Sequence, residues 1–202
     1  KDQKVFKSIL LGKIDNTVGG ISGGQFARYD KDNQAYLLKG ALRMPSGKSD
    51  WFNSLLLKLD QEKLSSISVK RKKIIFEIES KDRKLSLKNN PDLKIDEEKL
   101  KQVAEVIDAF YFYDVRKVNK IKKNNNNIIS YEFKDGLILE LKFIEKSKDS
   151  KESWIEISAQ SNNPKTINEA NDLNKKTKGY QFLANINTSV IFNWNIKDLI
   201  KK

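Results

Sequence analysis

One amphipathic stretch, residues 96–114, constrains the fold more than any other part of this 202-residue chain. Its apolar residues recur three and four positions apart, which is the spacing that gives a helix one apolar face. Asp96 is of a type that caps helix starts, and the two glutamates after it suit the positive end of the helix dipole. The apolar positions are Leu100, Val103, Ala104, Val106, Ile107 and Phe110. Strand-like runs lie on both sides, so we expect a long helix on which two small sheets close.

Alternating apolar and polar residues predict antiparallel strands before and after this helix. Before it come a strand over 8–14, a hairpin over 25–29 and 34–38, a short helix over 51–57, and a meander over 67–70, 74–78 and 84–88. After it come a meander over 129–133, 137–144 and 154–159, a helix over 164–178, a strand over 180–184 and a helical tail over 189–200. In the last two helices the residues expected to face the core are Ile167, Ala170, Asn171, Leu173, Val190, Ile191, Trp194 and Leu199.

The order of these elements predicts an α+β fold in which antiparallel β-meanders alternate with helices. Because a meander followed by a helix occurs twice, we also consider a duplicated sheet-plus-helix unit. The length suffices for one large domain or two small ones. We predict one α+β domain over residues 1–202, with two sub-units, 1–118 and 119–202, as a further option within it.

Neither cysteine nor histidine occurs in the sequence. Their absence rules out disulfides and thiolate metal ligands, and it removes the side chain that most often acts as general base or transition-metal ligand. Catalysis would have to use Asp, Glu, Lys, Ser or Tyr. Glu77 and Glu79 share one face of a predicted strand, but alternation on an exposed face explains them more simply than a catalytic pair. Since no recognisable catalytic motif is present, we predict that the protein is not an enzyme and binds no cofactor and no metal ion.

The chain carries 39 Lys and Arg against 27 Asp and Glu, which gives a formal net charge of +12. Nearly all of the positive charge is lysine scattered through every segment, and only five arginines are present. Proteins that read bases more often use clustered arginine, so we interpret the charge as a solvated basic surface and do not expect nucleic acid as a partner. The alternative is an anionic-polymer binder, for nucleic acid or polysaccharide, whose binding would fall steeply with salt.

Two groups of residues are candidates for interaction. The first is the glycine-rich segment with Gly19, Gly20, Gly23 and Gly24, followed by Arg28. It lacks the spacing and the Lys-Ser or Lys-Thr pair of a phosphate-binding loop, so we predict a hairpin tip. The second group is Tyr111, Tyr113 and Arg116. These residues could stack on bases, but packing at the end of the helix is the simpler interpretation.

Several short motifs, taken in order, resemble one bacterial family, domain of unknown function 4340. They are LLGK from Leu10, FARY from Phe26, QAYL from Gln34, DWF from Asp50, F-x-DGL from Phe133, Trp154, EA-x-x-LN from Glu169, GYQF from Gly179 and DLI from Asp198. Tyr180 stands where the family usually has Trp. The resemblance covers almost the whole chain, and the succession of motifs carries it rather than any single one.

What the resemblance implies is a location and a kind of partner. Members of this family look like envelope proteins with an N-terminal transmembrane helix and an extracytoplasmic α+β region, and some relatives are accessory subunits of ABC-type exporters. The resemblance therefore implies an anchor upstream of Lys1 and a position on the periplasmic face of the bacterial inner membrane. The family has no assigned catalytic residues that could be transferred to this chain.

These observations lead to one functional expectation and leave two alternatives. We expect a non-enzymatic, membrane-anchored extracytoplasmic domain that binds a protein partner in the cell envelope, through an exposed sheet edge and the glycine-rich segment. Binding of an anionic polymer is the first alternative, and a hydrolytic or transferase activity is the second and weaker one. The sequence does not point to a small-molecule ligand.

Overall fold

The computed structural model describes residues 8–18, 20–42, 53–90, 93–118, 127–148 and 151–201. It divides the chain into two compact units, Lys1–Ser46 and Gly47–Lys202, which are described separately below. Within the described residues there are two sheets, and every strand pair in them is antiparallel. The structure thus confirms the predicted α+β class with antiparallel sheets.

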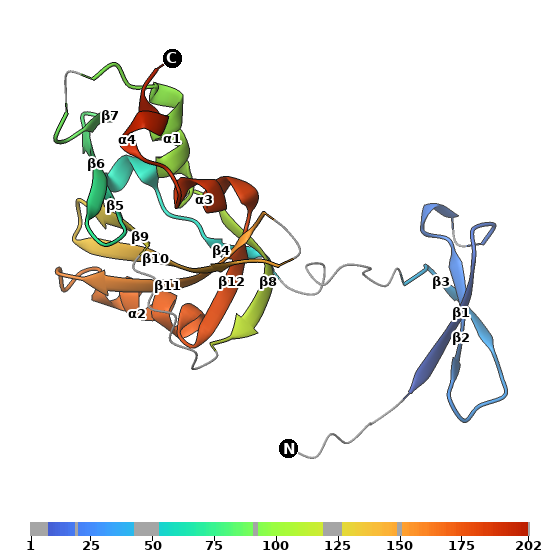
Figure 1. Ribbon diagram of the computed structural model, residues 1–202. Coiled ribbons are helices and arrows are strands. Elements are labelled where there is room, and N and C mark those ends of the chain that lie inside the picture. Colours follow the sequence, from blue (N-terminus) through green and yellow to red (C-terminus); the bar gives the residue numbers. More distant parts are fainter. Residues whose placement is uncertain are drawn as a thin grey trace. The chain divides into compact units, whose positions relative to one another are not determined.

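The N-terminal unit is one three-stranded sheet with the order β1-β2-β3 (Figure 1). Its strands are β1 (Ile9–Asp15), β2 (Gly24–Tyr29) and β3 (Tyr36–Lys39), and the short helix η1 (Gly20–Ser22) lies in the connection between the first two. No α-helix is present in the described residues of this unit. Both hairpins predicted from the sequence are therefore found here.

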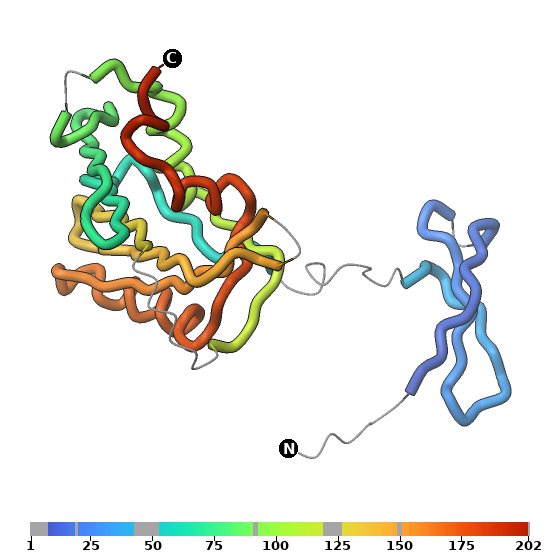
Figure 2. Tube along the Cα trace, viewed as in Figure 1, coloured from blue at the N-terminus to red at the C-terminus, as the bar shows by residue number. Residues whose placement is uncertain are grey.

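The second unit holds a nine-stranded sheet in the order β4-β8-β12-β11-β10-β9-β5-β6-β7 (Figure 1). The strands are β4 (Leu55–Leu57), β5 (Leu64–Lys70), β6 (Ile74–Lys81), β7 (Lys84–Leu87), β8 (Phe110–Lys117), β9 (Ile128–Phe133), β10 (Leu137–Lys146), β11 (Ser153–Ser161) and β12 (Tyr180–Ala184). The pairing of β5 with β9 brings the two predicted meanders side by side, as the tube in Figure 2 shows. They form one sheet, and the duplicated sheet-plus-helix unit is not confirmed.

Four α-helices and a short 3-10 helix complete the described part of this unit. They are η3 (Gln61–Lys63), α1 (Glu97–Glu105), α2 (Ile167–Thr177), α3 (Ile186–Ile191) and α4 (Ile196–Leu199). The side chain of Asp96 caps α1 by accepting a hydrogen bond from the Glu98 backbone, as its residue type predicted. The Asp96 N–H donates to the Leu199 carbonyl at 2.8 Å, which fixes the end of α4 beside the start of α1.

The core of this unit lies between one face of the sheet and the helices α1, α3 and α4. Alternate residues of the central strands are almost completely buried, among them Ile67, Ile129, Tyr131, Leu139, Leu141, Ile155 and Ile157. They join one cluster with Leu100, Val103 and Ala104 of α1 and with Ile191, Phe192 and Leu199 from the C-terminal helices. The hydroxyl of Tyr131 donates to the Val103 carbonyl at 2.9 Å, and burial raises the pKa of this phenol.

Helix α2 lies along β11, at an edge that none of the described strands covers (Figure 1). Strand β12 pairs with β11 only from Ser153 to Ile155, so no strand in the described part of the chain pairs with the Ala159 backbone on that side. The side chain of Asn174 takes that place: it accepts from the Ala159 N–H at 2.9 Å and donates to the Ala159 carbonyl at 2.7 Å. The amide of one helical residue thus completes the hydrogen bonds of the strand.

Two predicted helices are wrong in part. The long helix was expected within 96–114, with an apolar stripe that reaches Phe110 and an aromatic run after it that could end the helix, but α1 ends at Glu105 and β8 begins at Phe110. Phe110 and Phe112 are buried whereas Tyr111 and Tyr113 are exposed, and this period of two belongs to a strand. The short helix predicted over 51–57 is replaced at Leu55–Leu57 by β4, while Trp51 and Phe52 lie outside the described residues.

Other differences concern which residues face the core and where the chain divides. Ile167, Asn171 and Val190 were expected to be buried but are exposed, because α2 and α3 present other residues, such as Ala170 and Ile191, to the core. The two observed units divide after Ser46, whereas from the sequence we considered a division into sub-units between residues 118 and 119. Strands from both sides of that predicted boundary belong to the nine-stranded sheet.

Replacing Tyr131 by phenylalanine should lower the free energy of unfolding of the second unit by about 1 kcal/mol, because it removes one buried hydrogen bond and almost no volume. Urea unfolding followed by tryptophan fluorescence measures this unit alone, since Trp51, Trp154 and Trp194 all belong to it. Tyr111→Phe is the matched control, because Tyr111 is 46% exposed. Equal effects of the two substitutions would contradict the role given to the Tyr131 hydroxyl.

Candidate functional site

The N-terminal sheet carries an apolar surface that remains exposed among the described residues of its own unit. Residues paired across antiparallel strands share a face, and the pairs Ile9↔Tyr29, Leu11↔Ala27, Ala27↔Tyr36 and Gln25↔Leu38 therefore define one face. We call six of its apolar members, Ile9, Leu11, Ala27, Tyr29, Tyr36 and Leu38, the apolar sheet face. Its five large side chains are 40–56% exposed. At roughly 200 Å² for each large side chain, they offer on the order of 500 Å² of apolar surface.

Ala27 is the only buried apolar side chain among the described residues of this unit. It lies at the centre of the apolar sheet face, where larger neighbours enclose a cleft of about 300 Å³. The cleft is lined by Ile9, Ala27, Arg28, Tyr29, Tyr36 and Leu38. The opposite face is also apolar in part, since Leu10, Phe26 and Leu37 are about 40% exposed there. A sheet of this size without a core needs a further layer to be stable.

The predicted glycine-rich segment forms the connection between β1 and β2, which confirms that it closes a hairpin. Gly20 and Gly23 adopt φ values of 68° and 66°, which side chains rarely permit. Gly20 is exposed, whereas Gly23 and Gly24 are buried, and the Gly23 carbonyl accepts a hydrogen bond from Gly40 at 2.8 Å. The glycines are thus required by the turn itself. Gly19 lies outside the described residues.

Thr17 fixes the first turn of this connection through Asp15. Both the hydroxyl and the N–H of Thr17 donate to the Asp15 carboxylate, at 2.6 and 2.9 Å. These hydrogen bonds lower the pKa of Asp15. The carboxylate therefore organises the turn in its charged form.

Arg28 has a structural contact in the second hairpin. Its Nη1 atom donates to the Asp32 carbonyl at 2.8 Å, which closes the turn between β2 and β3. The residue is half-buried and is one of those that line the Ala27 cleft, although its pairing with Leu10 places its side chain on the opposite face of the sheet. Its guanidinium thus serves the loop.

Tyr111 and Tyr113 point away from the core of the second unit. They are 46% and 48% exposed and alternate with buried Phe110 and Phe112 along β8. Tyr111 pairs with Leu55 of β4, so these side chains share the outer face of the sheet near its edge. The interpretation as packing at the end of the helix does not hold for these two tyrosines, because they are exposed on a strand.

Arg116 of β8, by contrast, contacts side chains of three other strands of the sheet. Its Nε donates to Gln181 at 2.8 Å, its Nη2 donates to Glu145 at 2.8 Å, and the guanidinium lies 4.1 Å from the centre of the Trp154 ring. Gln181 donates in turn to Glu156 at 2.8 Å. These side chains come from β8, β12, β11 and β10, so the network ties the outer face of the sheet together.

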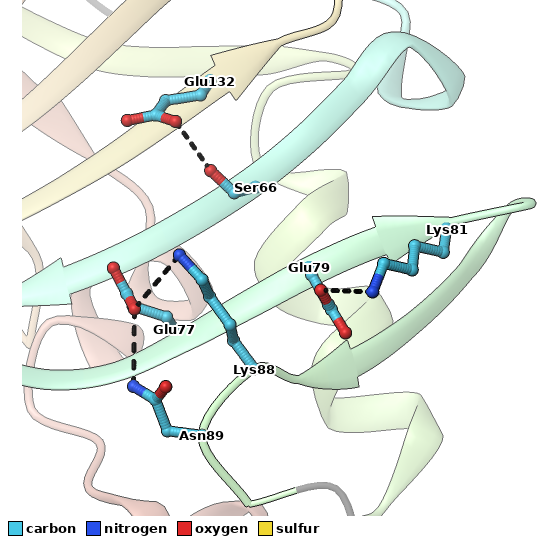
Figure 3. Close-up of polar contacts among 7 residues, drawn as sticks. All are labelled: Ser66, Glu77, Glu79, Lys81, Lys88, Asn89 and Glu132. Atoms are coloured by element: carbon cyan, nitrogen blue, oxygen red, sulfur yellow. Dashed lines mark hydrogen bonds and ion pairs between the residues drawn. The ribbon is translucent and has the colours of Figure 1, made fainter.

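The glutamates that the sequence marked as a pair bind different partners (Figure 3). Glu77 is 3.7 Å from the Lys88 ammonium and accepts from Asn89 at 3.4 Å, whereas Glu79 is 3.1 Å from Lys81. Glu132, on the neighbouring strand β9, accepts from the Ser66 hydroxyl at 2.9 Å. Each carboxylate therefore has its own neutralising or hydrogen-bonding group, as expected for the alternating face of a sheet.

A second cleft, of about 460 Å³, lies between α1 and the start of α3. Its lining includes the polar side chains Gln102, Glu105, Asn185 and Asn187 together with Trp194. Over the described ranges, no three Asp or Glu side chains come together in a way that could hold a metal ion. Nor is any of the described helices long and apolar enough to cross a bilayer.

The structure therefore brings together a set of residues that the sequence did not single out. Of the predicted candidates, Gly20, Gly23, Gly24 and Arg28 shape the hairpins beside the apolar sheet face, while Tyr111, Tyr113 and Arg116 belong to the second unit. The face itself was missed. Its signal is the presence of consecutive apolar residues in two short strands, Ile9 to Leu11 and Leu37 with Leu38, because such runs are typical of strands covered on both faces.

Comparison with known proteins gives one match. A family model described as "Domain of unknown function (DUF4340)" matches residues 4–127, more than half of the chain. The matched region includes the three-stranded sheet and extends through β8 of the second unit. No curated protein and no solved structure matches the chain.

Replacing Arg116 by alanine should lower the free energy of unfolding by about 1 kcal/mol, since it removes a partly exposed ion pair and the stacking on Trp154. Urea unfolding should be followed by circular dichroism, because loss of the Arg116 stacking can itself change the fluorescence of Trp154. Lys117→Ala is the control, as the neighbouring Lys117 is exposed. If Arg116→Ala unfolds at the same urea concentration as the wild type, the network does not support the sheet.

Proposed function

Because the chain belongs to the family "Domain of unknown function (DUF4340)" and carries an uncovered apolar sheet face, we propose that it is a protein-interaction module of the bacterial cell envelope. In this proposal the module is extracytoplasmic, is held at the inner membrane by an anchor upstream of these residues, and serves as an accessory subunit of an ABC-type exporter. Its task is to bind a partner protein and not to catalyse a reaction. The location and the exporter follow from what the family resemblance implies.

The observation that carries the proposal is the exposure of the apolar sheet face. Its apolar surface, on the order of 500 Å², matches the apolar share of one side of a standard protein–protein interface of about 800 Å² per partner. Water-exposed apolar patches of this size on a soluble unit are often functional. We place the partner on this face and not on the glycine-rich segment, since the backbone and side-chain contacts of that segment serve the turn.

The proposed occupant is an apolar segment of an envelope protein. Tyr29 and Tyr36 supply the broad, rigid surfaces that are enriched where proteins bind one another. Among the described residues of this unit, three acidic side chains nearly balance four basic ones: Asp15, Asp30 and Asp32 against Lys13, Arg28, Lys31 and Lys39. A local surface with so little net charge favours recognition by apolar contact over electrostatic steering, despite the overall charge of +12.

Leu11→Ser should reduce capture of the partner at least about fivefold, because a buried polar substitution at an interface costs 1 kcal/mol or more. The measurement incubates the intact protein with detergent-solubilised envelope from the bacterium that makes it and quantifies bound exporter and other envelope subunits by mass spectrometry.

Leu10→Ser is the matched control for this experiment. Leu10 and Leu11 are adjacent and 41% and 40% exposed, but they lie on opposite faces of the sheet. The control should keep at least half of the wild-type capture. Equal losses in both variants, or no envelope protein enriched by the wild type, would refute the proposal.

The proposed location has its own test. The chain contains no cysteine, so Lys176→Cys on the exposed side of α2 would introduce a unique thiol. A maleimide that cannot cross the inner membrane should label this variant in cells with a permeable outer membrane, to the same extent as a known periplasmic protein. Labelling only after lysis would place the second unit in the cytoplasm and would contradict the proposal.

A further inference from the structure

The second unit contains a cleft that the proposed function does not use. It has a volume of about 460 Å³ and lies between α1 and α3. This volume falls in the range of roughly 300–1,000 Å³ that is usual for small-molecule sites. Two of the residues that line it, Phe110 and Ile191, belong to the hydrophobic core and are 1% and 2% exposed. The packed core therefore fixes the bottom of the cleft.

Trp194 supplies an aromatic wall of this cleft, and two contacts hold it in place. Arg71 donates to its backbone carbonyl at 2.7 Å, and the Lys99 ammonium lies over its ring, 5.6 Å from the ring centre. The ammonium of Lys99 also donates a hydrogen bond to the Asp198 carbonyl. Trp194 is half-buried, so part of its indole stays accessible. A fixed and partly accessible aromatic ring offers a flat apolar surface to a ligand.

Polar side chains from two helices line the same cleft. Gln102 and Glu105 come from α1, and Asn187 and Thr188 come from α3. Within the described part of the chain, the side-chain amides of Gln102 and Asn187 form no hydrogen bond. Their donors and acceptors are therefore available to a molecule in the cleft.

Thr188 is the most informative of these residues, because it is only 3% exposed. Its N–H donates to the Asn185 side chain at 2.8 Å, but its hydroxyl has no hydrogen-bond partner among the described residues. The only side-chain oxygen that the described residues enclose completely without a partner is that of Ser153, so the Thr188 hydroxyl is open to the cleft that it lines. Since nearly buried polar groups normally have a partner, this hydroxyl points to one inside the cleft.

The charges around the cleft favour an uncharged ligand. Glu105 is the only charged side chain in the described lining, and the Lys101 ammonium lies 3.6 Å from its carboxylate. The carboxylate repels an anion, whereas Lys101 and the Lys99 ammonium over the Trp194 ring repel a cation. A ligand that fits should therefore be neutral, should both donate and accept hydrogen bonds, and should have an apolar face.

We infer that this cleft binds a neutral saccharide. The C–H groups on one face of a sugar ring carry small positive charges and pack on the negative face of an aromatic ring such as Trp194. The hydroxyls at the edge of the sugar both donate and accept, which matches the amides of Gln102 and Asn187 and the hydroxyl of Thr188. This site lies wholly in the second unit and shares no residue with the apolar sheet face.

Titration of the intact protein with neutral saccharides tests the inference. The probes are glucose, maltose, cellobiose and N,N′-diacetylchitobiose, and the readout is the indole N–H signals in proton–nitrogen correlation NMR. The variants Trp154→Phe and Trp194→Phe assign these signals. We expect at least one probe to shift the Trp194 signal in a saturable way while the Trp154 signal stays in place, because Trp154 does not line the cleft.

Two substitutions then test the polar contacts. Asn187→Ala and Thr188→Val should each weaken binding of that saccharide at least about fivefold, because each removes hydrogen bonds to it. Neither should lower the thermal unfolding temperature, since the groups removed form no hydrogen bond with the described residues. Asn168→Ala is the matched control: Asn168 is exposed and is the second residue of α2, as Asn187 is the second residue of α3. It should leave the affinity unchanged.

The inference is overturned if none of the four saccharides moves the Trp194 signal, or if either variant binds as tightly as the wild type. Galacturonate and putrescine serve as charged probes. A shift caused by one of them and by no neutral saccharide would show that the cleft selects a charged ligand, and this result would also overturn the inference. None of these outcomes affects the proposed function, which is measured by partner capture on the apolar sheet face.

Discussion

The covering of apolar sheet faces is the constraint on which the rest of this structure depends. A face that offers on the order of 500 Å² of apolar surface gains up to roughly 10 kcal/mol when it is removed from water, at about 25 cal/mol per Å². That gain is comparable with the entire stability of a typical domain. In the second unit α1, α3 and α4 supply the cover, and Tyr131 adds a hydrogen bond across the interface. In the N-terminal unit, Ala27 alone is buried among the described apolar residues. The large side chains of the apolar sheet face therefore do not contribute this free energy of burial.

The two sheets of this chain therefore differ in the kind of side chain that they expose to water. The nine-stranded sheet buries its own apolar face and turns a polar face outward, where Glu77, Glu79 and Glu132 bind neighbouring lysines and hydroxyls. The three-stranded sheet has apolar residues on both faces and few polar side chains between them. Large apolar side chains on an exposed sheet face are the feature on which the proposed interaction rests.

Much of the fold could be predicted from the sequence because its strands alternate clearly. The strands β5, β6, β9, β10 and β11 follow a period of two that leaves little choice of element. The end of the long helix could not be placed, because the apolar residues from Phe110 to Phe112 fit both a helical stripe and a strand. Pairing with β12 decided in favour of the strand. That both meanders join one sheet could not be foreseen either, since the contact of β5 with β9 links distant parts of the chain.

The candidate site was harder to predict than the fold. Glycines and arginines were selected from the sequence because these residue types often bind ligands. In the structure, Gly23 and Arg28 stabilise turns, and Arg116 joins strands of the sheet. The residues to which we assign binding in our proposal are ordinary leucine, isoleucine and tyrosine. Their role depends on what fails to cover them, which is a property of the three-dimensional arrangement and not of any local pattern.

The amide of Asn174 has a consequence for how the molecule behaves at high protein concentration. An open strand edge is a template on which other chains can polymerise, and the free part of β11 is long enough to act as one. Asn174 bonds both the N–H and the carbonyl of Ala159, so these groups cannot pair with another strand, and α2 covers the edge. The two sheets thus differ in what they leave open: the three-stranded sheet exposes apolar side chains on its face, while the nine-stranded sheet is protected along this edge from adding further strands.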